Sequence, residues 1–289
     1  MTNIVDLVKK RIAIGDGAMG TMLIEHGLKI GDCPERWNME KPDVVAMIHR
    51  SYIQAGCDFL ETNTFGANPV KLARFGLEDR TEEIVSKAVE IARSQSNERM
   101  VAGSIGPTGR VLEPYGDLSK REAFEAFRKV AIAMDSSEVD FFLIETMTDI
   151  EEALQAVRAV RDVSSRPLVT TMVFSKGQKG YRTMMGSTPL DCARKLLDEG
   201  VDIVGTNCCN GPIEATEIIA EMKQVTDMLI AQPNAGLPKI QDGKAIYPQE
   251  PKEFAKAMLE AVKAGARIVG GCCGTTPEHI RELTAVVAS

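Results

Sequence analysis

The sequence of 289 residues lacks several features that mark common classes of protein. It contains no run of 18 or more apolar residues, so no transmembrane helix is predicted. Near the start, the basic residues Lys9, Lys10 and Arg11 follow Val5 and Leu7, which is the wrong order for a signal peptide. The formal net charge is −7, so we expect no basic surface for nucleic acid or an anionic membrane. These absences favour a cytoplasmic protein.

Histidine is scarce as well. The chain has three histidines, His26, His49 and His279, and none of them follows a predicted strand. Metal-dependent hydrolysis of the histidine-rich kind is therefore not expected. The phosphate-binding pattern G-x-x-x-x-G-K-[ST] is absent from the sequence, which argues against nucleotide hydrolysis.

One short motif, residues 15–20 with glycine at its first, third and last positions, matches the dinucleotide-binding fingerprint. That fingerprint also requires an acidic residue at the end of the next strand, about 20 residues further on. Asp32 and Glu35 lie near this distance, but they flank Pro34 in a turn-like stretch. The next apolar run begins only at Cys57. A Rossmann fold is therefore not favoured.

The chain does contain eight short apolar runs that alternate with amphipathic stretches. Continuously apolar strands that alternate with helices indicate a parallel sheet covered on its outer face. Eight strands in a chain of this length favour closure of the sheet, so we predict an α/β fold, a single-domain (β/α)8 TIM barrel over residues 1–289. The predicted strands are residues 12–14, 57–60, 100–102, 140–144, 167–174, 201–204, 228–231 and 266–269, and the predicted helices include residues 42–55, 81–94, 120–136, 149–160, 188–199, 212–225 and 251–264.

Polar, glycine-rich and thiol-bearing residues gather directly after the predicted strands, at the end of a barrel where active sites lie. Cys208 and Cys209 follow the sixth run, and Cys272 and Cys273 follow the eighth. Strands six and eight are one strand apart across the mouth of a barrel, so the two pairs are expected to meet there. Adjacent residues of a regular strand point to opposite faces of the sheet. Cys272 and Cys273 can therefore bind one ion only if the backbone turns sharply. The three glycines around them permit such a turn.

The seven cysteines are an odd number and no export signal is evident, which favours metal binding over a disulfide framework. Three thiolates are suited to Zn²⁺, and three protein ligands leave one tetrahedral position for a substrate. A substrate thiol bound there would lose its proton and attack an activated methyl group, whereas a free thiol with a pKa of about 8.5 is mostly protonated at neutral pH. The spacing does not say which of Cys208 and Cys209 is the ligand. The alternative is that a cysteine serves only as a small buried hydrophobic residue, and we expect this for Cys33, Cys57 and Cys192.

Segments that span nearly the whole chain resemble the homocysteine S-methyltransferase family, and specifically the homocysteine-binding barrel of cobalamin-dependent methionine synthases. The resemblance implies that Cys208, Cys272 and Cys273 bind zinc and are the catalytic residues, and that Cys209 is not a ligand. The matching segments are GDGAMGTML (15–23), ETNTFGAN (61–68), GSIGPTG (103–109), ETMTD (145–149), GTNCCNGP (205–212), QPNAGLP (232–238) and GGCCGTTPEHI (270–280).

The resemblance also implies the residues that bind the substrate. Asp16, Gly17 and Glu145 are expected to hold the amino group of homocysteine, with Asn207 lining the site. Carboxylates are natural partners of an α-ammonium group, which agrees with this assignment. From the residues alone, each of these two acids also has a structural interpretation. Asp16 could be a plain turn residue, and Glu145 could form an ion pair with an arginine or lysine at the lip of the barrel. For Glu61, at the end of the second strand, we expect a supporting or structural role.

The implied activity is transfer of a methyl group to zinc-bound homocysteine, which gives methionine. The segment QPNAGLP resembles the methionine synthase branch, so the implied donor is a separate methylcorrinoid protein or a folate-linked partner. A corrinoid or folate would then enter only through that partner. The first alternative is a small donor such as betaine, S-methylmethionine or S-adenosylmethionine. The second is a non-catalytic subunit that binds zinc or thiols within a corrinoid methyltransferase complex.

Overall fold

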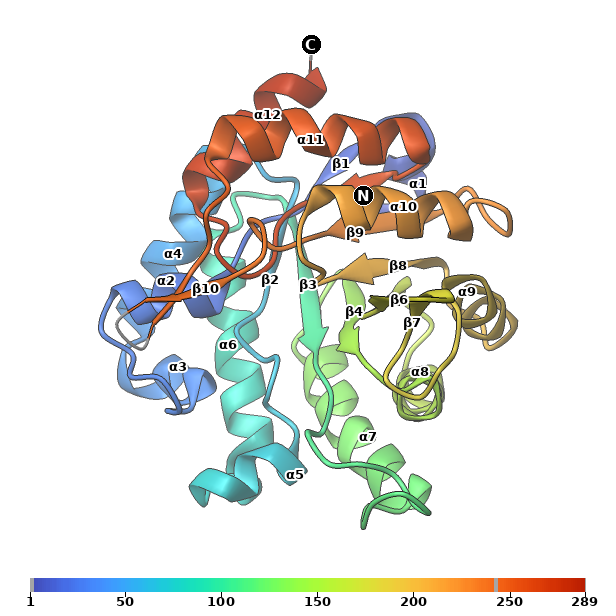
Figure 1. Cartoon of the computed structure of the whole chain (residues 1–289). Helices are drawn as coiled ribbons and strands as arrows, with labels where there is room; N and C mark the ends of the chain where they lie inside the picture. Colours follow the sequence, from blue (N-terminus) through green and yellow to red (C-terminus); the bar gives the residue numbers. More distant parts are fainter. Residues whose placement is uncertain (1–2, 242–243, 289) are drawn as a thin grey trace.

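Eight parallel strands form the central sheet of the computed structural model, which describes residues 3–241 and 244–288 (Figure 1). The order in the sheet is β1-β12-β9-β8-β5-β4-β3-β2, and helices surround the strands. The predicted α/β barrel is therefore confirmed, and β9 separates the sixth and eighth predicted strands as expected. The strands are β1 Ala13–Ile14, β2 Phe59–Glu61, β3 Met100–Ile105, β4 Phe141–Met147, β5 Leu168–Met172, β8 Ile203–Asn207, β9 Leu229–Gln232 and β12 Ile268–Val269.

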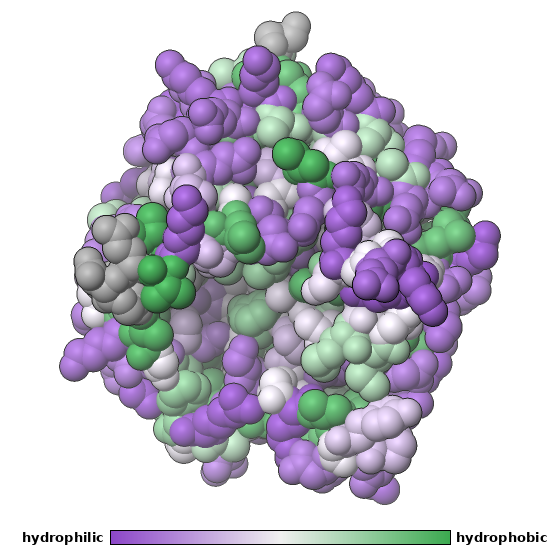
Figure 2. All heavy atoms as spheres, viewed as in Figure 1, coloured by the Kyte–Doolittle hydropathy of each residue, from purple (hydrophilic) through white to green (hydrophobic). Residues whose placement is uncertain are grey.

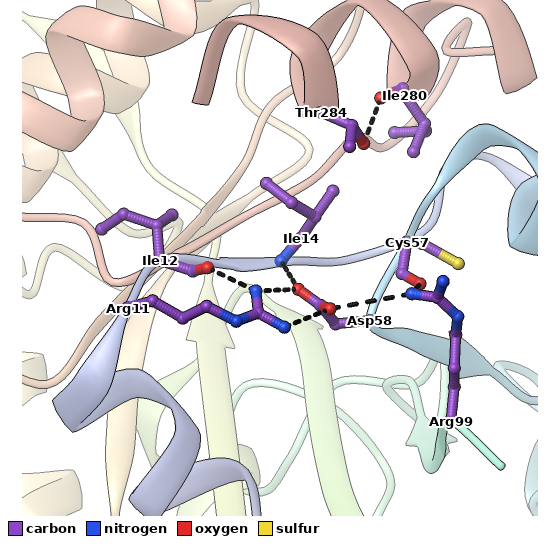
Figure 3. A network of polar contacts seen from close by, with 8 residues as sticks. All are labelled: Arg11, Ile12, Ile14, Cys57, Asp58, Arg99, Ile280 and Thr284. Carbon is purple, nitrogen blue, oxygen red and sulfur yellow. Dashed lines mark hydrogen bonds and ion pairs between the residues drawn. The ribbon is translucent and has the colours of Figure 1, made fainter. Parts of the chain in front are cut away.

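A small polar network joins the two end strands of the sheet, β1 and β2 (Figure 3). The backbone N–H of Asp58 donates to the carbonyl of Ile14 at 2.7 Å, and the Asp58 carboxylate accepts the N–H of Ile14 at 2.8 Å. Arg11 makes two further hydrogen bonds to this carboxylate, at 2.7 and 2.6 Å. Arg99 reaches both Asp58 and the carbonyl of Cys57. The half-buried Asp58 thus joins β1 to β2 through both its backbone and its carboxylate.

The helices begin and end where the sequence provides capping groups. Ser119 and Glu122 form a capping box at the start of α7, and Asp149 caps the first turn of α8. Gly56 ends α4 in the left-handed conformation. The predicted helices are observed as α4 Pro42–Ala55, α6 Thr81–Gln95, α7 Lys120–Ser136, α8 Ile150–Val163, α9 Pro189–Asp198, α10 Pro212–Met222 and α11 Pro251–Ala264, and further helices are α1 Ile4–Lys10, α2 Met19–Glu25, α3 Trp37–Glu40, α5 Pro69–Leu72 and α12 Pro277–Ala288.

Two antiparallel hairpins extend the connections after β5 and β9, on the side of the barrel where the parallel strands end. The first pairs β6 Ser175–Gly177 with β7 Gly180–Arg182, and the second pairs β10 Lys239–Gln241 with β11 Lys244–Ile246. Three short 3-10 segments lie in other connections, at Pro34–Arg36, Ala73–Phe75 and Glu78–Arg80. The hairpins and 3-10 turns were not predicted, because their sequences carry no apolar alternation.

The core has an inner and an outer part. Side chains from all eight strands fill the interior of the barrel, where Phe59 and Phe141 meet edge to face at 5.2 Å. Ile4 and Val8 of α1 pack against this inner cluster, so α1 covers the end of the barrel opposite the strand C-termini. The outer part lies between the strands and the surrounding helices. Within the described residues, no helix is long and apolar enough to cross a membrane.

Candidate metal and substrate site

Three thiols from two distant stretches of the chain meet at the mouth of the barrel. The sulfur atoms of Cys208, Cys272 and Cys273 all lie within 4.8 Å of one another, and those of Cys208 and Cys273 are 3.9 Å apart. Cys209 is buried and its thiol donates to the carbonyl of Gly211. The structure therefore brings Cys208, and not Cys209, into the cluster.

Unusual backbone conformations aim the three thiols at one point. Cys208 has a φ of 54°, in the left-handed region that non-glycine residues rarely adopt, directly after the last residue of β8. The predicted sharp turn after β12 is present, since the N–H of Thr275 donates to the carbonyl of Cys272 at 3.1 Å. Gly274 has a φ of 79° in this turn. Its conformational freedom is what allows adjacent cysteines to face the same cluster.

The cluster forms part of the wall of a cavity of about 320 Å³. Residues from the ends of most strands contribute to this wall, as expected for a barrel of this kind. Figure 2 shows a shaded hollow near the middle of the face on which both hairpins lie, with hydrophilic and hydrophobic residues around it. The wall contains Gly17, Ala18, Met19, Gly20, Thr21, Pro34, Glu35, Glu61, Thr62, Asn63, Phe65, Ser104, Glu145, Thr146, Asn207, Cys208, Gln232, Gly271, Cys272 and Cys273.

Glu145 faces the cavity from an irregular part of β4. The pairing of β4 with β5 shifts between Ile144 and Met147, and Thr146 has a φ of 61°. Such a bulge redirects the neighbouring side chains. The Glu145 carboxylate accepts hydrogen bonds from the Ser104 hydroxyl at 2.5 Å and from an Asn207 N–H at 3.2 Å. The alternative of an ion pair at the lip is not observed, because no arginine or lysine of the described residues forms a salt bridge with Glu145.

Asn207 connects the carboxylate to the thiol cluster. Its carbonyl oxygen accepts the N–H of Thr146 at 2.9 Å and the hydroxyl of Thr171 at 2.8 Å. Its amide then donates to Glu145 and lies 3.9 Å from the sulfur of Cys272. Asn207 therefore fixes the relative positions of Glu145 and one of the thiols. Thr171 was missed in the sequence, where a threonine inside a strand gives no signal for a site.

Asp16 and Glu61 are adjacent, but only Glu61 belongs to the wall of the cavity. Asp16 is 2% exposed, and one of its oxygens accepts the N–H of Glu61 at 3.0 Å. Its other oxygen is buried and has no hydrogen-bond partner among the described residues. Glu61 itself accepts a hydrogen bond of 2.5 Å from the Gln232 amide. Gly17 is part of the wall, and a Cβ atom there would lie 2.8 Å from the Thr275 hydroxyl.

Three carboxyl groups, those of Asp16, Glu61 and Glu145, lie in the wall of the cavity or directly behind it. Burial raises the pKa of Asp16 and of Glu61 well above the usual range, and the charges of the neighbouring carboxylates add to the effect. Burial also raises the pKa of Glu145, opposed by the hydrogen bond from Ser104. Uncompensated buried carboxylates are costly, so the cavity is suited to a cationic group such as an ammonium.

The thiol cluster stabilises one thiolate even without a metal. Hydrogen bonds from Cys208 and Cys272 lower the pKa of Cys273 to about 3. The pKa of Cys272 is raised well above its usual value by its hydrogen bonds with the other two thiols and by burial. One anionic sulfur is therefore shared among three, and a divalent cation would allow all three to ionise.

The three thiols fit a tetrahedral zinc ion. With Zn–S bonds of about 2.3 Å, ligand sulfurs of a tetrahedral site lie about 3.8 Å apart. The 3.9 Å between Cys208 and Cys273 is close to this value. Asn234 lies beside the cluster, because its amide N–H donates to the Cys208 carbonyl at 3.2 Å. Its own carbonyl oxygen is buried and has no hydrogen-bond partner among the described residues. The donor set is soft and preformed, as zinc prefers.

The fold and the cavity define a (β/α)8 barrel with a cluster of three thiols at its mouth. The sequence profile of homocysteine S-methyltransferases matches residues 13–287. This chain belongs to the homocysteine S-methyltransferase family. The prediction of an enzyme of this family is thereby confirmed.

Methionine synthases are among its relatives of known sequence. That of Mycobacterium tuberculosis is 35% identical over 305 residues, which cover 100% of this chain and 26% of the relative. That of Mycobacterium leprae is 34% identical over 309 residues, with 99% and 25% covered. The chain therefore spans about a quarter of the length of the curated relatives it matches.

A solved homocysteine methyltransferase from Escherichia coli, MmuM, has the same fold. Its metallated form superimposes with a TM-score of 0.81 at 24% identity, covering 97% of this chain and 98% of MmuM. Its oxidized form gives the same TM-score at 25% identity, with the same coverage. The barrel predicted from the sequence is thus also the fold of a solved homocysteine methyltransferase.

Proposed function

We propose that this chain transfers a methyl group to the sulfur of homocysteine and so produces methionine. Cys208, Cys272 and Cys273 would hold one Zn²⁺, and the cavity beside them would hold the amino acid. The observation that carries this proposal is the cluster of three thiols within 4.8 Å in the wall of a cavity that also contains carboxylates. Family membership and the metallated form of MmuM support it.

When bound, zinc would supply the Lewis acidity that keeps the substrate sulfur as a thiolate at neutral pH. The residues of the chain would provide the rest. Glu145, held by Ser104 and Asn207, would accept the α-ammonium of homocysteine. Asp16 does not line the cavity, so it would act through Glu61, whose N–H it accepts and whose carboxyl group it would hold at the wall. Gly17 lines the cavity, and a side chain there would collide with the buried Thr275 and Tyr52, so glycine would keep this part of the wall in place. In the reaction the sulfur forms a bond to the methyl carbon, and the donor leaves with the electron pair.

X-ray absorption at the zinc edge, with and without homocysteine, tests the proposal most directly. We expect one zinc per chain with three sulfur neighbours, and four once homocysteine is added. Cys208→Ala should lose the metal, and Cys209→Ala, a change of the adjacent cysteine, should keep it. Reduced protein that carries no stoichiometric zinc, or zinc that gains no sulfur from the substrate, would contradict the proposal.

The methyl donor is proposed to reach the mouth on a separate corrinoid protein or a folate-linked partner. The methionine synthases that resemble this chain are about four times as long, which is consistent with a donor carried on another segment or protein. A small donor is the competing candidate. Turnover of homocysteine with betaine, S-methylmethionine or S-adenosylmethionine alone would exclude a required corrinoid partner.

Three free thiols at one site also suit a reducing compartment such as the cytoplasm.

A non-catalytic zinc- or thiol-binding subunit is the alternative of a different class. The intact thiol cluster and its hydrogen-bonded carboxylate argue for catalysis instead. Cys272→Ala separates the two, because it should abolish methyl transfer in any assembled complex. Full activity of that complex without zinc at this site would favour the binding subunit.

A further inference from the structure

The connection between β9 and α11 folds back onto the cysteine turn, residues 272–275. The N–H of Ala235 donates to the carbonyl of Cys273 at 3.0 Å. After the hairpin β10–β11, the chain returns to the same place, since the N–H of Gln249 donates to the carbonyl of Ala235 at 3.1 Å. The return segment, residues 247–250, is therefore tied through the backbone to the turn that carries two of the three thiols.

Side chains of the return segment pack on both cysteine-bearing loops. The Oε1 atom of Gln249 would lie 3.6 Å from a Cβ atom added to Gly211, three residues after Cys208. Tyr247 packs on the cysteine turn itself, because a Cβ atom added to Gly274 would lie only 2.1 Å from Cγ of Tyr247. Whatever holds the return segment therefore also holds the surroundings of the thiols.

His279 of α12 makes the hydrogen bond that fixes this segment. Its Nε2 lies 3.0 Å from the carbonyl oxygen of Gln249. Its Nδ1 lies 3.2 Å from the backbone nitrogen of Thr276 and 3.0 Å from the Thr276 hydroxyl. A backbone N–H can only donate and a carbonyl can only accept, so Nδ1 is the acceptor and Nε2 carries the proton. One neutral imidazole thus joins the return segment to Thr276, which directly follows the cysteine turn.

The surroundings of His279 favour this neutral form. The side chain is 6% exposed, and the ring of Phe254 in α11 meets it edge to face at 5.5 Å. Burial lowers the pKa of His279, opposed by the carbonyl of Gln249 and by the charges of Glu250 and Glu278. The imidazole is therefore uncharged at neutral pH and keeps both of its hydrogen bonds.

We propose that His279 is a positioning residue for the metal centre, whose neutral imidazole ties the return segment to the cysteine turn and so holds Cys273 in place. The inference rests on the proposed zinc site. His279 does not line the cavity, so it acts through Gln249 and Ala235 on one side and through Thr276 on the other. A turn that is ordered beforehand need not be ordered by the metal, so less of the binding free energy is lost.

Two amide substitutions separate the two hydrogen bonds of the imidazole. His279→Gln places a donor N–H near the position of Nε2 and keeps the bond to Gln249. His279→Asn places an acceptor oxygen near the position of Nδ1 and keeps only the bond to Thr276. His26→Asn is the matched control, because His26 is exposed at the end of α2.

Four measurements report on the metal, the segment, the proton and the fold. Zinc affinity is measured by competition with a chromogenic chelator. Hydrogen–deuterium exchange of the metal-free proteins reports on the amides of the return segment. Nitrogen NMR of the wild-type imidazoles shows which ring nitrogen carries the proton, and His279→Asn assigns the signal among the three histidines. Thermal unfolding of the metal-free proteins reports on folding.

We expect His279→Asn to weaken zinc binding by about 10-fold, as the loss of one buried hydrogen bond would. Amide exchange in the return segment should become faster in the same variant. His279→Gln should keep most of the zinc affinity and the slow exchange, and His26→Asn should match the wild type in both. The nitrogen spectrum of the wild type should show the proton of His279 on Nε2.

Wild-type zinc affinity in His279→Asn, or a proton on Nδ1 in the spectrum, would overturn the inference. Equal losses of affinity in His279→Asn and His279→Gln would overturn it as well, because the residue would then act only by packing. Should His279→Asn fail to fold, the spectrum of the wild type and the zinc affinity of His279→Gln still decide. Wild-type protein that binds no zinc would instead contradict the proposed function, and the spectrum and the exchange would still test the contacts of His279.

Discussion

Glu145 is the residue whose surroundings define the substrate side of the site. Its two oxygens accept hydrogen bonds from Ser104 and Asn207, so the carboxylate is held toward the cavity rather than free to turn. Burial raises its pKa, and a cationic ligand would reverse this effect by favouring the ionised form. Affinity for an ammonium group should therefore depend on this one charge.

Glu145→Gln is expected to raise the KM for homocysteine by about 10-fold or more, because a charge-assisted hydrogen bond contributes about 1.5–3 kcal/mol. Zinc content should be unchanged. Steady-state kinetics with metal analysis checks both. Glu152→Gln is a suitable control, since Glu152 is also buried but binds Thr108 and does not line the cavity. Equal KM effects of the two changes would remove Glu145 from the site.

Glu61 illustrates how a carboxyl group in the site costs stability. Its folded pKa is raised, first by burial and then by Asp16, so the folded protein keeps a proton that the unfolded chain releases above the ordinary carboxyl pKa of about 4. In this range the folded state binds more protons, and the free energy of unfolding falls as the pH rises toward the folded pKa.

We therefore expect Glu61→Gln to raise the melting temperature of the ligand-free protein near neutral pH and to weaken its decline as the pH rises above the ordinary carboxyl pKa of about 4. Each kcal/mol gained corresponds to about 2–4 °C. Thermal unfolding over this pH range is the measurement. Glu217→Gln should show no gain, because exposed Glu217 has a pKa lowered by Lys176 and Tyr181. A lower melting temperature for Glu61→Gln at neutral pH would disprove this account.

At the scale of elements, Asp58 joins the first and second strands at the seam of the barrel (Figure 3). Asp58→Ala should reduce the free energy of unfolding by about 2 kcal/mol, because it leaves the N–H of Ile14 without a partner and removes the charged acceptor of Arg11. Urea unfolding measures the change. Asp162→Ala breaks only an exposed pair with Arg128 and should cost less than about 1 kcal/mol. Similar losses would mean that the seam is held by the backbone alone.

The turn after β12 makes a second prediction about an element. Gly274→Ala should abolish stoichiometric zinc binding, because a Cβ there collides with Tyr247 and the φ of 79° disfavours a side chain. Gly76→Ala is the matched control, since Gly76 has a φ of 66° with nothing near its Cβ position. It should cost only about 1–2 kcal/mol of stability and leave zinc unaffected. Metal analysis after gel filtration decides. Normal zinc content in Gly274→Ala would show that the turn tolerates a shift.

The hairpins and short helices show where local pattern was insufficient. Helices over residues 42–55, 120–136 and 251–264 begin and end where the sequence predicts, because their amphipathic repeat and caps are local signals. The hairpin β6–β7 is polar, and contacts of Lys176 and Tyr181 with Glu217 of α10 hold it. Such a segment has no pattern of its own, so it could not be found without the rest of the fold.

For the whole molecule, metal binding should be coupled to folding, since the two cysteine-bearing loops are brought together only in the closed barrel. Zinc at about 1,000 times its dissociation constant is expected to stabilise the protein by about 4 kcal/mol. Thermal unfolding after chelation and after addition of zinc measures this. Cys272→Ala should show no zinc-dependent shift, and Cys192→Ala, a buried cysteine of α9, should keep the shift. A shift that survives Cys272→Ala would place the metal elsewhere.

The class of fold and the meeting of the two cysteine pairs follow from the residues alone. Apolar periodicity sets which segments are strands and helices, and eight alternating units leave a closed parallel sheet as the solution that buries them. Once the strands are parallel and ordered, their C-terminal ends share one face. Cys208 and Cys272 are therefore neighbours even if the predicted ends of their strands are wrong by a residue or two.

Which side chains face the site depends instead on how the chain packs in three dimensions. Cys208 rather than Cys209 joins the cluster because of a backbone φ of 54°, and Glu61 rather than Asp16 lines the cavity because Asp16 is turned under the second strand to accept its N–H. Tyr247 packs against Gly274 of the cysteine turn only because the hairpin β10–β11 brings the chain back to the mouth. These directions depend on single dihedral angles and on packing between segments far apart in the chain, which no local pattern records.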